Sequence, residues 1–71
     1  MARVQLIEKY ADILKLMADA GEEGDTNVLL DKLIYMGRKM TGEEVAEGDI
    51  YKGIPDDFDY AALMEDVKAL G

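Results

Sequence analysis

Residues 4–20, VQLIEKYADILKLMADA, decide the fold of this chain. Apolar residues recur there at intervals of three and four, which is the period of an amphipathic helix. One apolar row has the a/d spacing of a coiled coil, and a second row runs beside it. The first row consists of Val4, Ile7, Ala11, Leu14 and Ala18, and the second of Leu6, Tyr10, Ile13 and Met17. The pattern predicts one long helix over the whole stretch.

The apolar arc of this predicted helix is wide. At about 100° per residue, the two rows together cover more than half of the circumference, which exceeds what one neighbouring helix needs. Two interpretations stay open. Either the helix packs on both of its sides within the monomer, or the first row, from Val4 to Ala18, forms the seam of a homodimer.

The composition favours association with another chain. Apolar residues make up 49% of the 71 residues, yet so short a domain buries only about 60% of the surface that its unfolded chain exposes. Apolar surface that is left over in this way is typically covered by a partner or a second copy. The sequence has no cysteine, so helix packing or self-association must supply the stability that disulfides give to other small domains.

A second long helix is predicted over residues 27–41, after Gly21 ends the first one as its C′ residue. Gly37 lies inside this helix at a cost of roughly 1 kcal/mol relative to alanine, which either a close helix crossing or a frayed helix end would explain. Val28 and Tyr35 lie seven residues apart on its polar side. They are either ordinary exposed residues or a secondary contact with a partner chain.

Two weaker elements precede the last helix. Thr41-Gly42-Glu43-Glu44 matches the capping-box pattern and predicts a short helical turn through Glu47. Residues 49–55 are expected to form an extended linker, because the residue before a proline is biased away from helix. Three apolar residues are expected to anchor this linker to the core: Ile50, Tyr51 and Ile54.

The C-terminal helix is expected to begin at Pro55-Asp56-Asp57, with either aspartate as its N-cap. Its apolar stripe is narrow and consists of Tyr60, Leu63, Met64, Val67 and Leu70. No segment alternates clearly enough to predict a strand. The sequence therefore predicts a single all-α domain over residues 1–71. It is a small bundle of two long helices and a C-terminal helix, with a short helical turn and an extended linker before the last helix.

The negative charge is concentrated in the last thirty residues. The whole chain carries −8, while residues 1–20 sum to zero, residues 21–41 to −1 and residues 42–71 to −7. Most of the acids there are helix-capping candidates, which stabilise the positive end of a helix dipole. The alternative is a surface that attracts a basic partner protein. This predicted acidic patch consists of Glu43, Glu44, Glu47, Asp49, Asp56, Asp57 and Asp59.

Several classes of function are disfavoured by the residue inventory. An acidic chain is repelled by nucleic-acid phosphates and anionic lipid, so neither direct nucleic-acid binding nor membrane binding is expected. The absence of His, Cys and Ser removes the common nucleophiles, proton shuttles and soft metal ligands. The acids do not follow the spacing of a calcium loop. We therefore expect no catalytic residues, no metal, no cofactor and no enzymatic activity, and without a leader or membrane span we expect a cytoplasmic location.

The function that the sequence favours is that of a small acidic protein–protein interaction module. It would act as a regulator, inhibitor or accessory subunit, self-associating through the first helix and contacting a protein partner that is basic. The alternative is a nucleic-acid mimic that inhibits a DNA- or RNA-binding protein by presenting the acids of residues 43–59. The methionines suit adaptable contacts, but core packing is the better explanation for them.

Overall fold

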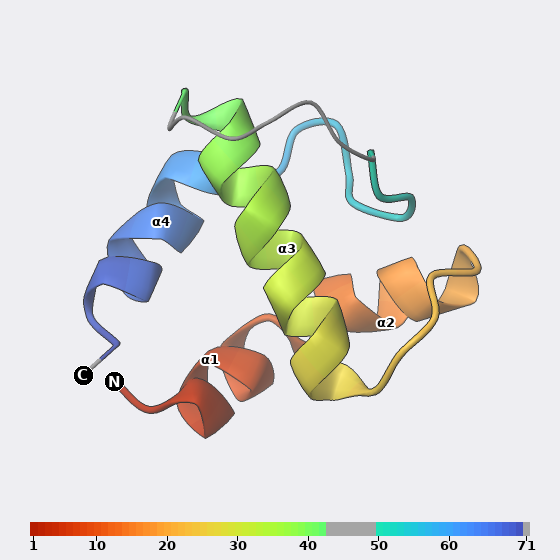
Figure 1. The fold of residues 1–71 in the computed structure, drawn as a ribbon, viewed down its shortest axis with the longest axis horizontal. Helices are drawn as coiled ribbons and strands as arrows, with labels where there is room; N and C mark the ends of the chain where they lie inside the picture. Colours follow the sequence, from red (N-terminus) through yellow and green to blue (C-terminus); the bar gives the residue numbers. More distant parts are fainter. Residues whose placement is uncertain (43–49, 71) are drawn as a thin grey trace.

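The computed structural model describes residues 1–42 and 50–70, and in this part of the chain all regular structure is helical, without strands (Figure 1). The helices are α1 (Arg3–Lys9), α2 (Ala11–Asp19), α3 (Thr26–Met40) and α4 (Tyr60–Lys68). Helix α3 runs through the middle of the molecule, with α1 and α2 near its N-terminal end and α4 beside its C-terminal half (Figure 1). The short turn predicted up to Glu47 falls mostly outside the described residues.

The prediction of one long helix over residues 4–20 is wrong, because the chain breaks at Tyr10. There the backbone adopts φ −105° and ψ 20°, and α1 and α2 run in different directions. The break is held by contacts with distant residues: the Tyr10 ring lies edge-on to Phe58 with centroids 5.8 Å apart. Local helix propensity is weak enough for such tertiary packing to override it. The bend lets both halves of the stretch turn toward α3.

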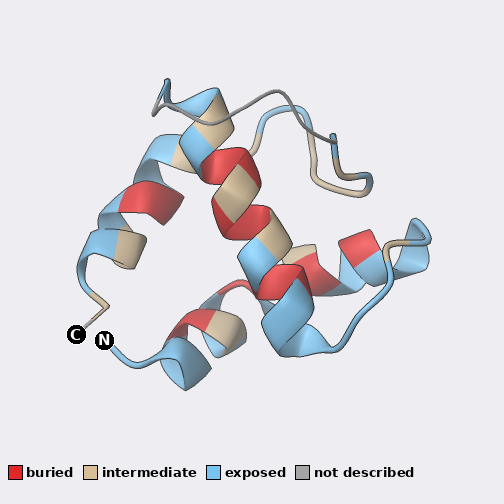
Figure 2. Cartoon of the chain, in the orientation of Figure 1, coloured by how far each residue is buried: buried red, intermediate tan, exposed pale blue. Residues whose placement is uncertain are grey.

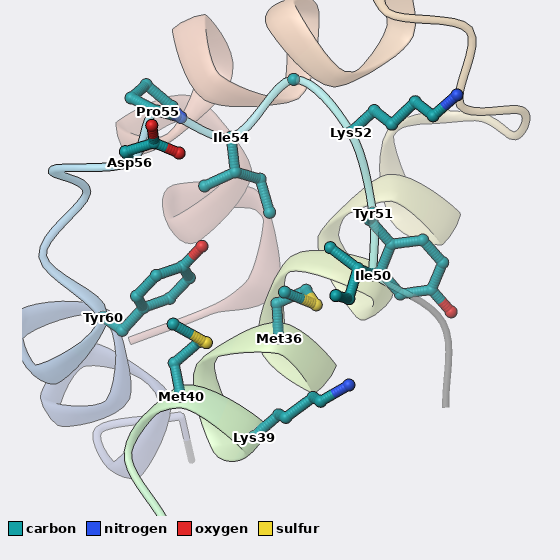
Figure 3. A pocket seen from close by; sticks show the side chains of 11 residues that line it. Met36, Lys39, Met40, Ile50, Tyr51, Lys52, Ile54, Pro55, Asp56 and Tyr60 are labelled. Carbon is teal, nitrogen blue, oxygen red and sulfur yellow. The ribbon is translucent and has the colours of Figure 1, made fainter. Parts of the chain in front are cut away.

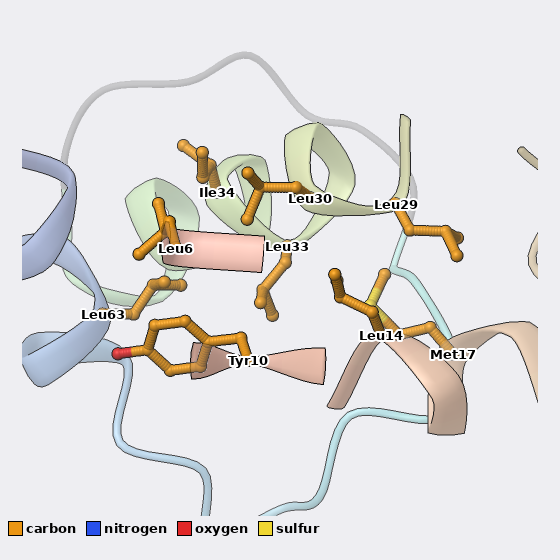
Figure 4. Packing of buried hydrophobic residues seen from close by; sticks show 9 residues of the cluster. All are labelled: Leu6, Tyr10, Leu14, Met17, Leu29, Leu30, Leu33, Ile34 and Leu63. Carbon is orange, nitrogen blue, oxygen red and sulfur yellow. The ribbon is translucent and has the colours of Figure 1, made fainter. Parts of the chain in front are cut away.

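The core gathers around α3. Its most buried members include Leu30 and Leu33, which have no exposed surface, and the Tyr10 ring lies among them with its hydroxyl directed toward α4 (Figure 4). The buried faces of the helices turn inward, and the exposed faces turn outward (Figure 2). The cluster consists of Leu6, Tyr10, Leu14, Met17, Leu29, Leu30, Leu33, Ile34 and Leu63.

Helix α3 agrees with its predicted bounds to within one residue at each end. Its N-cap is Asp25, whose side chain accepts a hydrogen bond from the amide of Val28 at 2.9 Å. Gly37 marks the crossing of α3 with α4, because a Cβ there would lie 2.7 Å from Met64 Sδ and 3.1 Å from Leu63 Cδ2. Of the two explanations for this glycine, the close helix crossing is therefore correct.

Glycine also ends α2 as predicted. Gly21 has φ +102°, its amide donates to the Ala18 carbonyl at 3.0 Å, and the Glu22 amide donates to the Met17 carbonyl at 3.1 Å. This pair of hydrogen bonds is a Schellman motif. It satisfies the last carbonyls of α2 and turns the chain toward α3.

The N-cap predicted for α4 is wrong. Neither Asp56 nor Asp57 caps the helix; Asp59 does, accepting a hydrogen bond from the Ala62 amide at 3.0 Å. The reason is a turn closed by the Phe58 amide on the Pro55 carbonyl at 3.1 Å. This turn brings Phe58 to the core before the helix can begin.

Residues 50–55 form neither helix nor strand, and they are held to the core unevenly. Tyr51 and Ile54 pack against it, whereas Ile50 is 74% exposed and is therefore not the expected anchor. Gly53 lies directly on α2 with φ +93°; a Cβ there would collide with the Leu16 carbonyl oxygen. The segment therefore depends on a glycine that the sequence had not singled out.

Candidate functional site

A shallow groove of about 170 Å³ lies where α1 and α2 meet the N-terminal end of α3. Four of the five residues predicted for the homodimer seam line it. The fifth, Val4, lies one turn before Ile7 on the same side of α1 and is 59% exposed. The groove is lined by Ile7, Ala11, Leu14, Lys15, Ala18, Thr26 and Leu29.

The residues predicted for the seam differ in burial. Leu14 is 2% exposed and belongs to the core, so it forms the floor of the groove and cannot protrude toward a partner. Ile7 is half-buried, while Ala11 and Ala18 are exposed. The second apolar row supplies Leu6, Tyr10 and Met17 to the monomer core. This part of the wide apolar arc is therefore covered within the monomer. The exposed part of the first row is what remains available to a partner.

The charge at this groove is balanced. Lys15 lines it, and its Nζ lies 2.9 Å from Asp19 Oδ2 in an exposed i,i+4 pair. Such a pair contributes only about 0.3–0.5 kcal/mol, but it places equal and opposite charges at the edge of the groove. With mainly apolar side chains on its walls, the groove is suited to an apolar side chain of another protein.

Three members of the predicted acidic patch lie in the described part of the chain. Asp56 and Asp57 are exposed, and Asp59 is used as the N-cap of α4. The position of Asp59 at the start of α4 therefore agrees with the interpretation of these acids as helix-capping residues. The remaining members, Glu43, Glu44, Glu47 and Asp49, lie outside the described residues.

The predicted secondary contact does not form one exposed stripe. Val28 is 42% exposed, but Tyr35 is half-buried, and its ring lies edge-on to Tyr51 with centroids 6.0 Å apart. Tyr35 therefore helps to hold the segment of residues 50–55 against α3.

A second pocket, of about 480 Å³, was not predicted from the sequence. It lies between the C-terminal half of α3 and residues 50–56, and its apolar side chains point toward one another in Figure 3. The one sequence signal that could have indicated it is the pair Met36 and Met40, one helical turn apart. The lining includes Met36, Met40, Ile50, Ile54, Pro55 and Tyr60.

A polar cluster ties α1 to α4. The Tyr10 hydroxyl donates to Asp66 Oδ2 at 2.6 Å, and Lys9 Nζ lies 2.8 Å from the same oxygen. Burial, then the bond to Asp66, raises the pKa of Tyr10 well above its ordinary value. The hydrogen bonds from Lys9 and then Tyr10 lower the pKa of Asp66. Both groups thus stay in one protonation state near neutral pH, which fits a structural role and not proton transfer.

This cluster predicts acid-sensitive stability. Because the pKa of Asp66 is lower in the folded chain than its ordinary 3.8, its stabilisation is present above that value and is lost as the pH falls through the folded pKa. Asp66→Asn should therefore lower the melting temperature at pH 7 by several degrees, and the difference from wild type should shrink at acidic pH. Circular dichroism melts over a pH series measure this; a difference independent of pH would contradict the prediction.

Within residues 1–42 and 50–70, no three potential ligands among His, Cys, Asp and Glu are grouped as a metal ion would require. In the same part of the chain, none of the helices has both the length and the apolar character needed to cross a bilayer. The chain matches no protein-family model, no curated protein and no solved structure.

Proposed function

We propose that this chain is a small protein-interaction module that forms a homodimer through the groove between α1, α2 and α3. The observation that carries the proposal is that Ile7, Ala11 and Ala18, selected by heptad spacing alone, line one groove despite the bend at Tyr10. In this role it would serve as a regulator, inhibitor or accessory subunit.

The charge distribution favours a second copy as the occupant. Residues 42–71 carry −7, so two copies that met through this part would repel each other. Residues 1–20 sum to zero, and the charged residue that lines the groove, Lys15, is paired with Asp19. Two copies therefore approach with the least repulsion through α1 and α2.

The shape of this surface suits a two-fold arrangement. Val4 protrudes beside the groove, and Ala11 and Ala18 are small enough to admit a neighbouring backbone closely. A two-fold interface is self-complementary, so the same protrusion and the same groove are used by both copies. In this proposal Val4 of each copy contacts the groove of the other.

A matched pair of variants tests the proposal. Ala11→Glu places a charge in the groove at the first residue of α2, where the helix dipole tolerates an acid. Ala61→Glu adds the same charge to the exposed first turn of α4. We expect Ala11→Glu to raise the dimer dissociation constant at least about tenfold, or roughly 1.4 kcal/mol, and Ala61→Glu to change it little. Sedimentation equilibrium measures both.

The result that contradicts the proposal is equal behaviour of the two variants, or a wild-type chain that is strictly monomeric at every concentration. Val4→Gln provides an independent check at an exposed position that contributes no core packing. It should also weaken the dimer while leaving the melting temperature of the monomer unchanged.

The other expectations remain proposals. We infer that the chain is not an enzyme, because its residue inventory lacks His, Cys and Ser. A cysteine-free chain suits a reducing compartment, so we propose that it acts in the cytoplasm. The acidic patch would contact a basic partner in addition to the dimer. Nucleic-acid mimicry has less support, because basic residues interrupt the acids along the helices: Lys9, Lys15, Lys32, Arg38 and Lys39.

A further inference from the structure

We infer that this self-association is controlled by ionic strength and is promoted by salt, a conclusion that rests on the proposed homodimer. Most ion-paired interfaces weaken as salt is added, because salt screens the attraction between the partners. For this chain we expect the opposite: the dimer should become stronger as salt is added. Two properties lead to this expectation, namely the location of the ion pairs and the net charge of the chain.

The basic residues of the proposed interface region are already engaged within the monomer. Arg3 lies 3.0 Å from Asp31, Lys9 lies 2.8 Å from Asp66, and Lys15 lies 2.9 Å from Asp19. These are all the basic side chains of residues 1–20. Apart from Lys15 and Thr26, the residues that line the groove are apolar. The attraction between two copies is therefore apolar, and added salt does not screen it.

Repulsion between the two copies, in contrast, acts over the whole molecule. Each copy carries −8, and its dimensions are 29 × 27 × 20 Å. At an ionic strength of about 0.01 M the screening length is about 30 Å, so charges throughout each copy, and not only those beside the interface, repel the other copy. At about 0.15 M it is about 8 Å, which is shorter than any dimension of the molecule. Salt therefore removes repulsion and leaves the apolar contact intact.

Sedimentation equilibrium of the full chain in sodium chloride tests this inference. Between about 0.01 M and about 0.15 M, the dimer dissociation constant should fall at least about tenfold. The double variant Asp56→Asn/Asp57→Asn changes the net charge from −8 to −6 at two exposed positions outside the groove. Because repulsion scales with the square of the charge, the change in log Kd should fall to about half.

The experiment distinguishes failure of the predicted salt dependence from failure of the proposed homodimer. A dimer that is sensitive to Ala11→Glu, but whose dissociation constant rises or stays constant with salt, overturns the inference and leaves the homodimer standing. An equal salt response in the Asp56/Asp57 variant also overturns it, because a general salting-out of apolar surface does not depend on net charge. Absence of a dimer at every salt concentration overturns both.

Discussion

Gly53→Ala is expected to destabilise the fold by about 3 kcal/mol or more, which is a large part of the roughly 4–10 kcal/mol expected for a domain of this length. Two costs add. The φ of +93° disfavours any residue with a Cβ, by about 1–2 kcal/mol. The Cβ would also meet the Leu16 carbonyl oxygen and lie 2.7 Å from Met17 Cα. Both are backbone atoms of α2, so neither can move aside as a flexible side chain would.

Gly21→Ala is the matched control for this prediction. Gly21 has a similar φ of +102°, but a Cβ there would meet nothing within 4 Å. It therefore incurs only the conformational cost. Urea denaturation of both variants measures the difference, which reports the contact between residues 50–55 and α2. Equal losses of stability would show that this contact is not close in solution.

Leu33→Ala is expected to cost about 2–5 kcal/mol, the range for a fully buried leucine whose removal leaves a cavity. Leu33 has no exposed surface and belongs to the cluster that joins all four helices. Leu16→Ala is the control, because that side chain is 44% exposed on α2. It should cost under about 1 kcal/mol. Thermal melts by circular dichroism compare the two; similar losses would contradict the position of α3 at the centre of the core.

The sequence predicted helices well where local signals and packing agree. The bounds of α3 follow from its apolar period and from polar residues at its N-terminus. Gly21 marks the end of α2 because only a residue without a Cβ fits φ +102° comfortably. For Gly37 the pattern left a close helix crossing and a frayed helix end equally open, and the contacts with Leu63 and Met64 decide for the crossing.

The break at Tyr10 could not be predicted, because its causes lie far along the chain. Phe58 and Asp66 fix the Tyr10 ring and hydroxyl from 48 and 56 residues away. Nothing within residues 4–20 resembles a helix stop: the stretch contains neither glycine nor proline. The same limit explains the misplaced cap of α4, since three aspartates compete and the packing of Phe58 selects the last.

The part of the candidate groove that α1 and α2 supply could be predicted from the sequence, but the part that α3 supplies could not. Heptad spacing identified the four lining residues Ile7, Ala11, Leu14 and Ala18 on the first two helices. Thr26 and Leu29, which close the groove from α3, could not be assigned to it without the packing of α3 against α2. The pocket between α3 and residues 50–56 was missed for the same reason.

Amide chemical shifts recorded over a dilution series of the wild-type protein test whether this groove is the self-association surface. If two copies associate through the groove, the amide shifts of four residues that line it depend on concentration: Ala11, Lys15, Ala18 and Thr26. The shift of Ala61, on the exposed first turn of α4, stays constant. Shifts confined to α4 or to residues 50–56, with the groove amides unchanged, would contradict it.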